Sequence, residues 1–252
     1  MPQVEHRVEA GIARIILNRP EKRNALSPEL IALLSAALDD SARNEQVRVV
    51  ILGGAGADFC SGADLAAFDR AAESGVLDHL ETARALADVL LKMRRHPRPI
   101  VAAVHGRALA GGCGLATACD LILASESARF GYPEVNIGFV PAMVMAILRR
   151  NVSEKRAFEL ITTGETISAA DALRDGLINR VYADAEFEAR VEEYSASLAA
   201  KSASAISLSK RLLYHMDSMA FDAAIEAGIH GNALARMTED ARAGVAKFAR
   251  KK

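Results

Sequence analysis

Two glycine-containing turns carry the residues of this sequence that are best suited to chemistry. One is residues 110–114 (AGGCG), which follows an apolar run at 100–104 and precedes a helix predicted at 115–119. The other is residues 61–65 (SGADL), which follows an apolar run at 47–52. Backbone N–H groups at a helix start have no partner inside the helix, and the helix dipole adds partial positive charge there. Such turns can bind a phosphate or a developing oxyanion.

The motifs of the common nucleotide-binding loops are missing at these turns. No Lys-Ser or Lys-Thr follows the glycines at 111–114, and no G-x-G-x-x-G pattern occurs there. Tight strand–helix packing is the alternative explanation for the glycines. Because both turns follow a strand, one acyl oxygen could lie between them, which favours an oxyanion hole over a phosphate cradle.

Four other polar side chains are candidates for roles in a site. Glu134, directly after Pro133, is either the proton carrier or a solvated loop charge. Asp64 is interpreted as a charge in the first turn of a helix, and Asp120 as a buried structural acceptor. His105 is interpreted as a strand-end side chain that bonds to the backbone.

The three cysteines, Cys60, Cys113 and Cys119, form no C-x-x-C pair. Their apolar surroundings are typical of small buried thiols in a reducing compartment, rather than of disulfides or zinc ligands. A catalytic thiol at Cys113 is an alternative, although no partner histidine can be placed from the sequence. The N-terminal residues lack the basic-then-apolar pattern of a signal peptide. We therefore expect a cytoplasmic protein without a metal site.

Length and composition limit the class of protein. The 252 residues fit one large domain, or one domain with a small appendage. Hydrophobic residues make up 51% of the chain, yet no apolar run is long enough to span a membrane. The 31 Lys and Arg residues are balanced by 32 Asp and Glu residues, so neither a nucleic acid nor a membrane surface is an expected partner.

Strands and helices alternate before residue 184, which predicts an α/β fold. Residues 4–8 and 12–17 predict an antiparallel hairpin, and Ser27 with Pro28 predicts a helix start. Beyond residue 184 the pattern is helical throughout, over 185–201, 204–217, 221–237 and 239–250. We therefore predict a core over residues 1–195 and a helical C-terminal region over residues 196–252.

Several motifs, in order and spacing across nearly the whole chain, resemble those of the crotonase (enoyl-CoA hydratase/isomerase) superfamily. They are LNRP at 17–20 with NAL at 24–26, SGADL at 61–65, GGC at 111–113, ACD at 118–120, FGYPE at 130–134 with IG at 137–138, TG at 163–164, and AL at 172–173 with GL at 176–177. The resemblance implies a spiral of repeated ββα units and a C-terminal helical region that builds a homotrimer or homohexamer. It also implies a coenzyme A thioester as substrate, with no further cofactor.

The resemblance also implies roles for individual residues. In this family two backbone N–H groups polarise the thioester carbonyl, and they fall on Ser61 and Gly111, while the proton carrier falls on Glu134. Phosphates of coenzyme A would meet Lys22 and Arg23. The implied set of substrate-binding residues is Lys22, Arg23, Ala25, Ser61, Gly62, Ala63, Asp64, Gly111 and Gly114.

Gly114 stands where the hydratases of the family usually carry the first of two glutamates. A glycine can neither orient water nor move a proton, so Glu134 would act alone. One carboxylate is compatible with our leading hypothesis, reversible hydration of a 2-enoyl-CoA to a 3-hydroxyacyl-CoA, and with the alternative, Δ3,Δ2-enoyl-CoA isomerisation. If a water site is already shaped beside this glycine, Gly114→Glu should raise hydration.

Bulky residues at 139–145, where many members have glycines, are expected to narrow the acyl pocket.

Two other classes of function stay open. One is a family member that binds coenzyme A esters or RNA without catalysis, although the sequence lacks interleaved basic and aromatic runs. The other is a nicotinamide oxidoreductase, which would need a glycine fingerprint that is missing here. In addition, none of Tyr182, Tyr194 and Tyr214 is followed four residues later by a lysine.

Overall fold

The computed structural model describes residues 2–66 and 74–249, and its centre is a six-stranded sheet. The predicted hairpin at its edge is antiparallel, and the other neighbouring strands are parallel. Aliphatic runs form the inner strands because both faces of a parallel sheet are covered. In spatial order the strands are β1 (Val4–Glu9), β2 (Ile12–Leu17), β3 (Val49–Gly54), β4 (Ile100–Val104), β6 (Leu121–Ser125) and β9 (Arg180–Tyr182).

A second, three-stranded sheet contains β5 (Arg107–Leu109), β7 (Arg129–Gly131) and β8 (Thr166–Ser168). The sequence analysis does not predict it, because three residues are too few to show an alternating pattern. Isolated parallel bridges align two further loops beside this sheet. One joins Cys60 to Ala108 of β5, and the other joins Leu26 to Ala63.

Four successive stretches of the chain repeat one ββα pattern, which is the predicted spiral. In each, a strand of the large sheet leads to a short extended segment and then to a helix. The short segment is β5 or β7 in the last two repeats, and only an isolated bridge in the first two. The four helices are α1 (Pro28–Arg43), α3 (Val76–Arg95), α4 (Gly111–Ala118) and α5 (Ala142–Asn151). Part of the helix predicted after residue 65 falls on residues 67–73, which lie outside the described residues.

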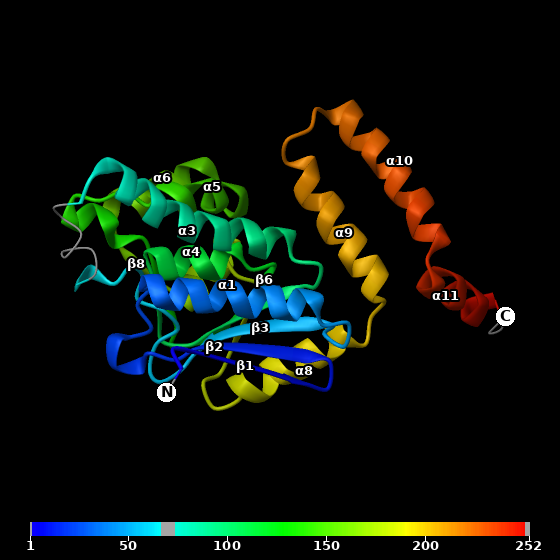
Figure 1. Cartoon of the computed structure of the whole chain (residues 1–252), viewed down its shortest axis with the longest axis horizontal. Coiled ribbons are helices and arrows are strands. Elements are labelled where there is room, and N and C mark those ends of the chain that lie inside the picture. Colours follow the sequence, from blue (N-terminus) through cyan, green and yellow to red (C-terminus); the bar gives the residue numbers. More distant parts are fainter. Residues whose placement is uncertain (1, 67–73, 250–252) are drawn as a thin grey trace.

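Helices cover both faces of the large sheet (Figure 1). α1 and α3 lie on one face and contribute Leu34 and Met93 to the main core. On the other face α8 (Phe187–Ala199) packs Phe187 and Val191 against the sheet. The connections that complete the core are η1 (Pro20–Lys22), η2 (Pro133–Ile137), α6 (Glu154–Thr163) and α7 (Ala169–Arg174).

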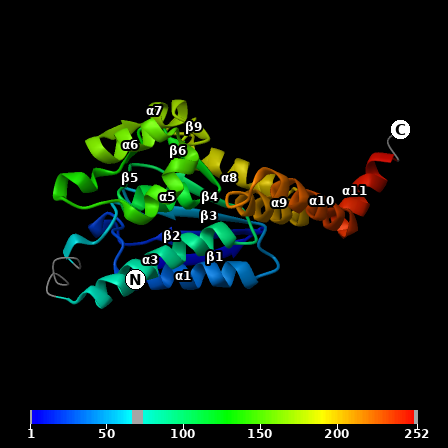
Figure 2. The ribbon, with the colours of Figure 1, turned by 90° about the horizontal axis from the view of Figure 1, so that it is seen from above.

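Three helices form a C-terminal arm that extends away from the core (Figures 1 and 2): α9 (Ala203–Met216), α10 (Phe221–Met237) and α11 (Glu239–Ala249). No residue of α10 or α11 is buried, and both helices expose large apolar side chains: Phe221, Ile225, Ile229, Leu234, Met237, Val245 and Phe248. The predicted boundary between residues 195 and 196 falls inside α8, which packs on the sheet, so the arm begins after α8. Across the described residues, none of the helices combines the length and apolar character needed to span a membrane.

A buried ion pair attaches the arm to the core. Lys210 is the one buried residue of α9, and its Nζ donates to Asp120 Oδ2 at 2.7 Å. Tyr214 of the same helix donates to Asp120 Oδ1 at 2.6 Å, and the Ile100 N–H donates to Asp120 Oδ2 at 2.6 Å. Asp120 is therefore a structural acceptor, as the sequence predicted, with a side chain that is 13% exposed rather than fully buried.

Candidate active site

The glycine turn at residues 110–114 is the first turn of α4, so this helix begins four residues earlier than predicted. Gly112 is needed because a Cβ atom on it would lie 2.3 Å from the Cys60 carbonyl oxygen. Ala110 precedes the helix with a φ of 51°, a conformation that non-glycine residues rarely adopt. Close packing thus explains part of the glycine content, and it brings the N-terminus of α4 against the second turn.

The hydrogen bonds of the second turn correct one predicted donor. The Ser61 N–H donates to the Arg23 carbonyl oxygen at 3.0 Å, so the prediction that this amide is a free oxyanion donor is wrong. The Leu26 N–H donates to the Gly62 carbonyl oxygen at 2.7 Å. Because the N–H and C=O of a trans peptide point in opposite directions, the Ala63 N–H points away from Leu26.

Among the amides of these turns, those of Ala63 and Gly111 are candidates to bind a substrate. Within residues 2–66 and 74–249, neither the Ala63 N–H nor the Gly111 N–H has an acceptor. The turns are in contact, since a Cβ atom on Gly62 would lie 3.3 Å from the Gly111 nitrogen. The pair Ala63 and Gly111 therefore replaces the predicted pair. The sequence alone does not show whether the Ser61 amide or the Ala63 amide is available. The chain turns between these two residues at Gly62, whose positive φ of 95° is visible only in the structure.

Glu134 lies in the first turn of η2 with its carboxylate buried. The residue is 8% exposed, and within the described chain its Oε2 atom has no hydrogen-bond partner. Burial raises the pKa of this carboxyl above its usual value. The alternative of a solvated loop charge is therefore wrong. A carboxyl with a raised pKa and an oxygen without a partner in the described chain is suited to take up and return a proton.

Cys113, in α4, lies close to Glu134 but does not have the properties of a nucleophile. Burial, with a smaller contribution from the Glu134 charge, raises the pKa of its thiol to about 12. The thiolate is the reactive form, so a buried thiol with such a pKa is inert. Tyr132, whose hydroxyl lies 3.3 Å from Thr117 Oγ1, is fully buried beside it. These neutral groups give the carboxylate an environment of low polarity.

Val144 of α5 occupies the space beside Gly114. A Cβ atom on Gly114 would lie 2.0 Å from Val144 Cγ1 and 2.6 Å from Val144 Cβ, and Val144 is buried. No glutamate side chain can enter there unless α5 moves. The condition under which Gly114→Glu would raise hydration, a water site already shaped beside Gly114, is therefore not met. Val144 belongs to the bulky segment at 139–145, so this segment fills space beside Gly114.

The remaining predicted substrate contacts surround the two turns. Lys22 and Arg23 are exposed at the end of η1, where cationic side chains can meet phosphates. Ala25 is buried, and its carbonyl oxygen accepts a hydrogen bond from Arg19 Nη1 at 2.7 Å. The other Arg19 nitrogen, Nη2, pairs with Asp64 Oδ2 at 3.0 Å, so Asp64 is held in an ion pair.

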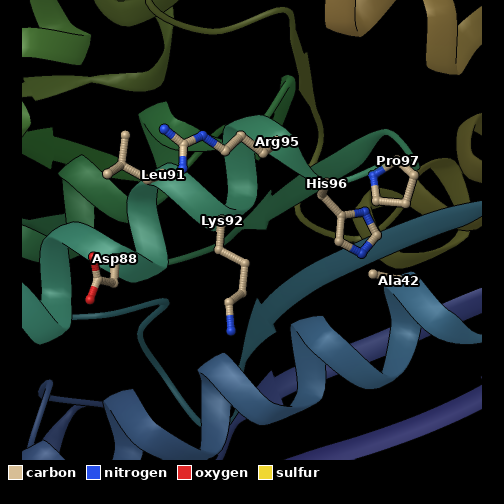
Figure 3. A pocket seen from close by; sticks show the side chains of 7 residues that line it. All are labelled: Ala42, Asp88, Leu91, Lys92, Arg95, His96 and Pro97. Carbon is tan, nitrogen blue, oxygen red and sulfur yellow. The ribbon is translucent and has the colours of Figure 1, made fainter.

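Two surface hollows lie between α1 and α3. One of about 290 Å³ is lined by residues of α1 and α3, among them Lys92, Arg95 and His96 (Figure 3). The Lys92 side chain points toward α1, where its Nζ pairs with Asp39 Oδ2 at 2.6 Å. A second hollow, of about 460 Å³, lies between the same two helices. Neither contains a predicted site residue. No cluster of three or more potential metal ligands occurs in the described part of the chain.

Comparison with known proteins was made on sequence and on structure. The model of the enoyl-CoA hydratase/isomerase family matches residues 7–252. A relative from Thermus thermophilus, provisionally named an enoyl-CoA hydratase, is 39% identical over 97% of this chain and 97% of its own length. The crystal structure of an enoyl-CoA hydratase from Mycobacterium smegmatis has a TM-score of 0.95 and 35% identity, and covers 100% of this chain and 98% of its own. That of human enoyl-CoA hydratase domain-containing protein 3 has a TM-score of 0.94 and 31% identity, and covers 99% and 98%.

The fold, a spiral of ββα repeats followed by a helical C-terminal region, is of the crotonase type. The chain belongs to the enoyl-CoA hydratase/isomerase family. It is therefore an enzyme of a family of hydratases and isomerases, and the two reactions make different demands on its site.

Proposed function

We propose that this enzyme acts on an enoyl-coenzyme A thioester, with Glu134 as the proton carrier and the amides of Ala63 and Gly111 as donors to the thioester oxygen. The observation that supports this most is the buried Glu134 Oε2 without a partner in the described chain. A buried carboxylate oxygen without a hydrogen bond destabilises the fold, so its presence indicates a function.

The reaction that the geometry favours is isomerisation of a 3-enoyl-CoA to a 2-enoyl-CoA. Glu134 takes a proton from C2, and the electrons move onto the thioester oxygen to give an enolate. Each amide donor lowers the barrier by roughly 3–4 kcal/mol, since it faces the charge that develops there. The enolate then collapses as Glu134 returns the proton to C4. One carboxylate suffices, and the apolar wall formed by Gly114 and Val144 is no obstacle.

Hydration of a 2-enoyl-CoA is the second candidate, and the hydratase names of the relatives favour it. Glu134 would take a proton from water as the oxygen adds to C3, and would return that proton to C2. The water would then have to be held without a second carboxylate.

The two reactions are compared on purified protein, with 3-hexenoyl-CoA for isomerisation and crotonyl-CoA for hydration. We expect isomerisation to be faster, and Glu134→Gln to lower its kcat by a factor of about 10² to 10⁴. Glu165→Gln, which changes an exposed glutamate, is the matched control and should retain full activity. Full activity of Glu134→Gln on both substrates would contradict the proposal.

Three further features of the function stay proposals. Lys22 and Arg23 would contact the phosphates of coenzyme A. The exposed apolar side chains of α10 and α11 would pack against other copies of the chain, in a homotrimer or homohexamer, because such a surface is unfavourable in water. A role in fatty acid metabolism and a cytoplasmic location also remain predictions.

A further inference from the structure

A single guanidinium joins the two loops that surround the Ala63 amide, and we infer that Arg19 is a positioning residue that aims this amide at the thioester oxygen. Arg19 itself touches neither substrate nor reacting atoms in this account. The inference rests on the proposed function, because the direction of the Ala63 N–H matters only if that amide binds the oxygen.

The contacts of Arg19 span both loops. Its Nη1 donates to the Ala25 carbonyl oxygen at 2.7 Å, and its Nη2 pairs with Asp64 Oδ2 at 3.0 Å. The Arg19 and Asp64 side chains are only 14% and 12% exposed, so solvent screens their interaction less than that of a surface pair. Ala25 directly precedes Leu26, and Asp64 directly follows Ala63.

Those neighbours matter because Leu26 sets the direction of the Ala63 N–H. The Leu26 N–H donates to the Gly62 carbonyl, which belongs to the same peptide unit as the Ala63 N–H, and the Leu26 carbonyl accepts from the Asp64 N–H at 3.2 Å. A rotation of this peptide would change the direction of the Ala63 N–H. By holding the residue before Leu26 and the residue after Ala63, Arg19 opposes this rotation.

The first loop also needs such support because its backbone is strained. Arg23 and Asn24 have φ values of 51° and 55°, in the left-handed region that non-glycine residues avoid. The buried Asn24 side chain stabilises the loop by accepting from the Arg19 N–H at 2.9 Å and donating to the Ala55 and Asp58 carbonyls. Arg19 thus contributes to both ends of a loop that would otherwise relax.

Arg19 also neutralises a charge next to the proposed oxyanion hole. Asp64 follows Ala63 directly, and the positive charge of Arg19 beside it reduces the repulsion between this carboxylate and negative charge developing on the thioester oxygen. Arg19 could therefore act by positioning the Ala63 amide or by neutralising the Asp64 charge. The variant Asp64→Asn separates these two effects, because it removes the charge and keeps an oxygen that can accept from Arg19.

The test reads the hole directly through the carbonyl stretching frequency of bound butyryl-CoA labelled with ¹³C at the thioester carbon. Donors at the oxygen lower this frequency, so the wild type should show a lowered band. We expect Arg19→Met to lose most of that shift and to lower kcat about tenfold or more, since misplaced groups cost rate steeply. Arg19→Lys should recover part of both, and Asp64→Asn should keep the shift. Arg19→Met combined with Asp64→Asn should still lack it.

Arg107→Met is the matched control for a purely structural effect. Arg107 pairs with Asp58 at 2.8 Å. This ion pair stabilises the start of the loop that contains Ala63, five residues before Ala63 itself. We expect a lower melting temperature with the carbonyl shift and kcat retained. If Arg19→Met behaves like Arg107→Met, or if the double variant recovers the full shift, the positioning role is wrong. If wild-type protein binds butyryl-CoA without any shift, the proposed oxyanion hole itself is wrong.

Discussion

The two sides of the site around α4 differ in what they offer a substrate. On one side Glu134 presents a buried carboxylate oxygen, which has no partner in the described chain and whose carboxyl has a raised pKa. On the other side Gly114 and Val144 fit so closely that a Cβ atom on the glycine would lie 2.0 Å from the valine Cγ1. One side has a carboxyl suited to move a proton, whereas the other is filled by the apolar side chain of Val144. This difference favours chemistry by a single carboxylate.

The largest effect that we expect on the apolar side is on stability. Gly114→Ala places a methyl group inside the Val144 side chain, so the free energy of unfolding should fall by about 3 kcal/mol, at the upper end for an overpacked core. Urea denaturation measures this. Gly244→Ala is the control, because a Cβ atom there meets nothing within 4 Å in α11, and its effect should be neutral or stabilising. Equal stability of the two variants would show that Val144 does not fill the space beside Gly114.

A second pair of substitutions would place a carboxylate on the Gly114 side as well as on the Glu134 side. Gly114→Glu alone should not raise hydration, since the new side chain has no room, whereas Gly114→Glu with Val144→Gly removes the obstacle. We expect hydration of crotonyl-CoA by the double variant to exceed that of Val144→Gly by about tenfold or more, because a second acid/base group is then present. Product analysis of matched time courses measures the hydration rate of each variant. A gain from Gly114→Glu by itself would contradict the packing described for Val144.

The smallest effect is a shift in pH dependence that belongs to the Glu134 side. A base must be ionised to accept a proton, so activity should rise with pH as this carboxyl loses its proton. Because burial raises its pKa, the acidic limb of log(kcat/KM) should lie above pH 4.5, the ordinary value for a glutamate. Rates over a pH series check this, with unfolding followed in parallel to exclude acid denaturation. A limb at or below pH 4.5 would mean that the carboxyl is solvated.

Much of the fold follows from the sequence because the pattern is strong. The hairpin, the buried parallel strands and the helices of the C-terminal arm all occur close to the predicted residues, since apolar runs determine them locally, and Ser27 caps α1 as predicted. The second sheet was not predictable in this way. Its three-residue strands pair with segments far away in the chain, and only the tertiary structure brings them together.

The site was also predictable only in part, because local sequence marks some of its residues whereas tertiary packing determines the rest. Gly111 and Glu134 stand in motifs that mark them, and the structure leaves the amide of one and the carboxylate of the other available. The exchange of Ser61 for Ala63 depends on a peptide direction set by Leu26, and the contact between Gly114 and Val144 depends on how α5 packs against α4. Neither can be inferred from residue types or spacing.

The most direct test of the central claim, that Glu134 alone moves the proton, is deuterium incorporation into 3-hexenoyl-CoA incubated with the enzyme in D₂O. Mass spectrometry and NMR of the recovered thioesters locate the label. We expect deuterium to accumulate at C2 and C4 with wild-type protein over many reversible turnovers, because the Glu134 carboxyl exchanges its proton with D₂O between turnovers, and almost none with Glu134→Gln at equal enzyme concentration and time. Equal labelling by the two proteins would contradict the account.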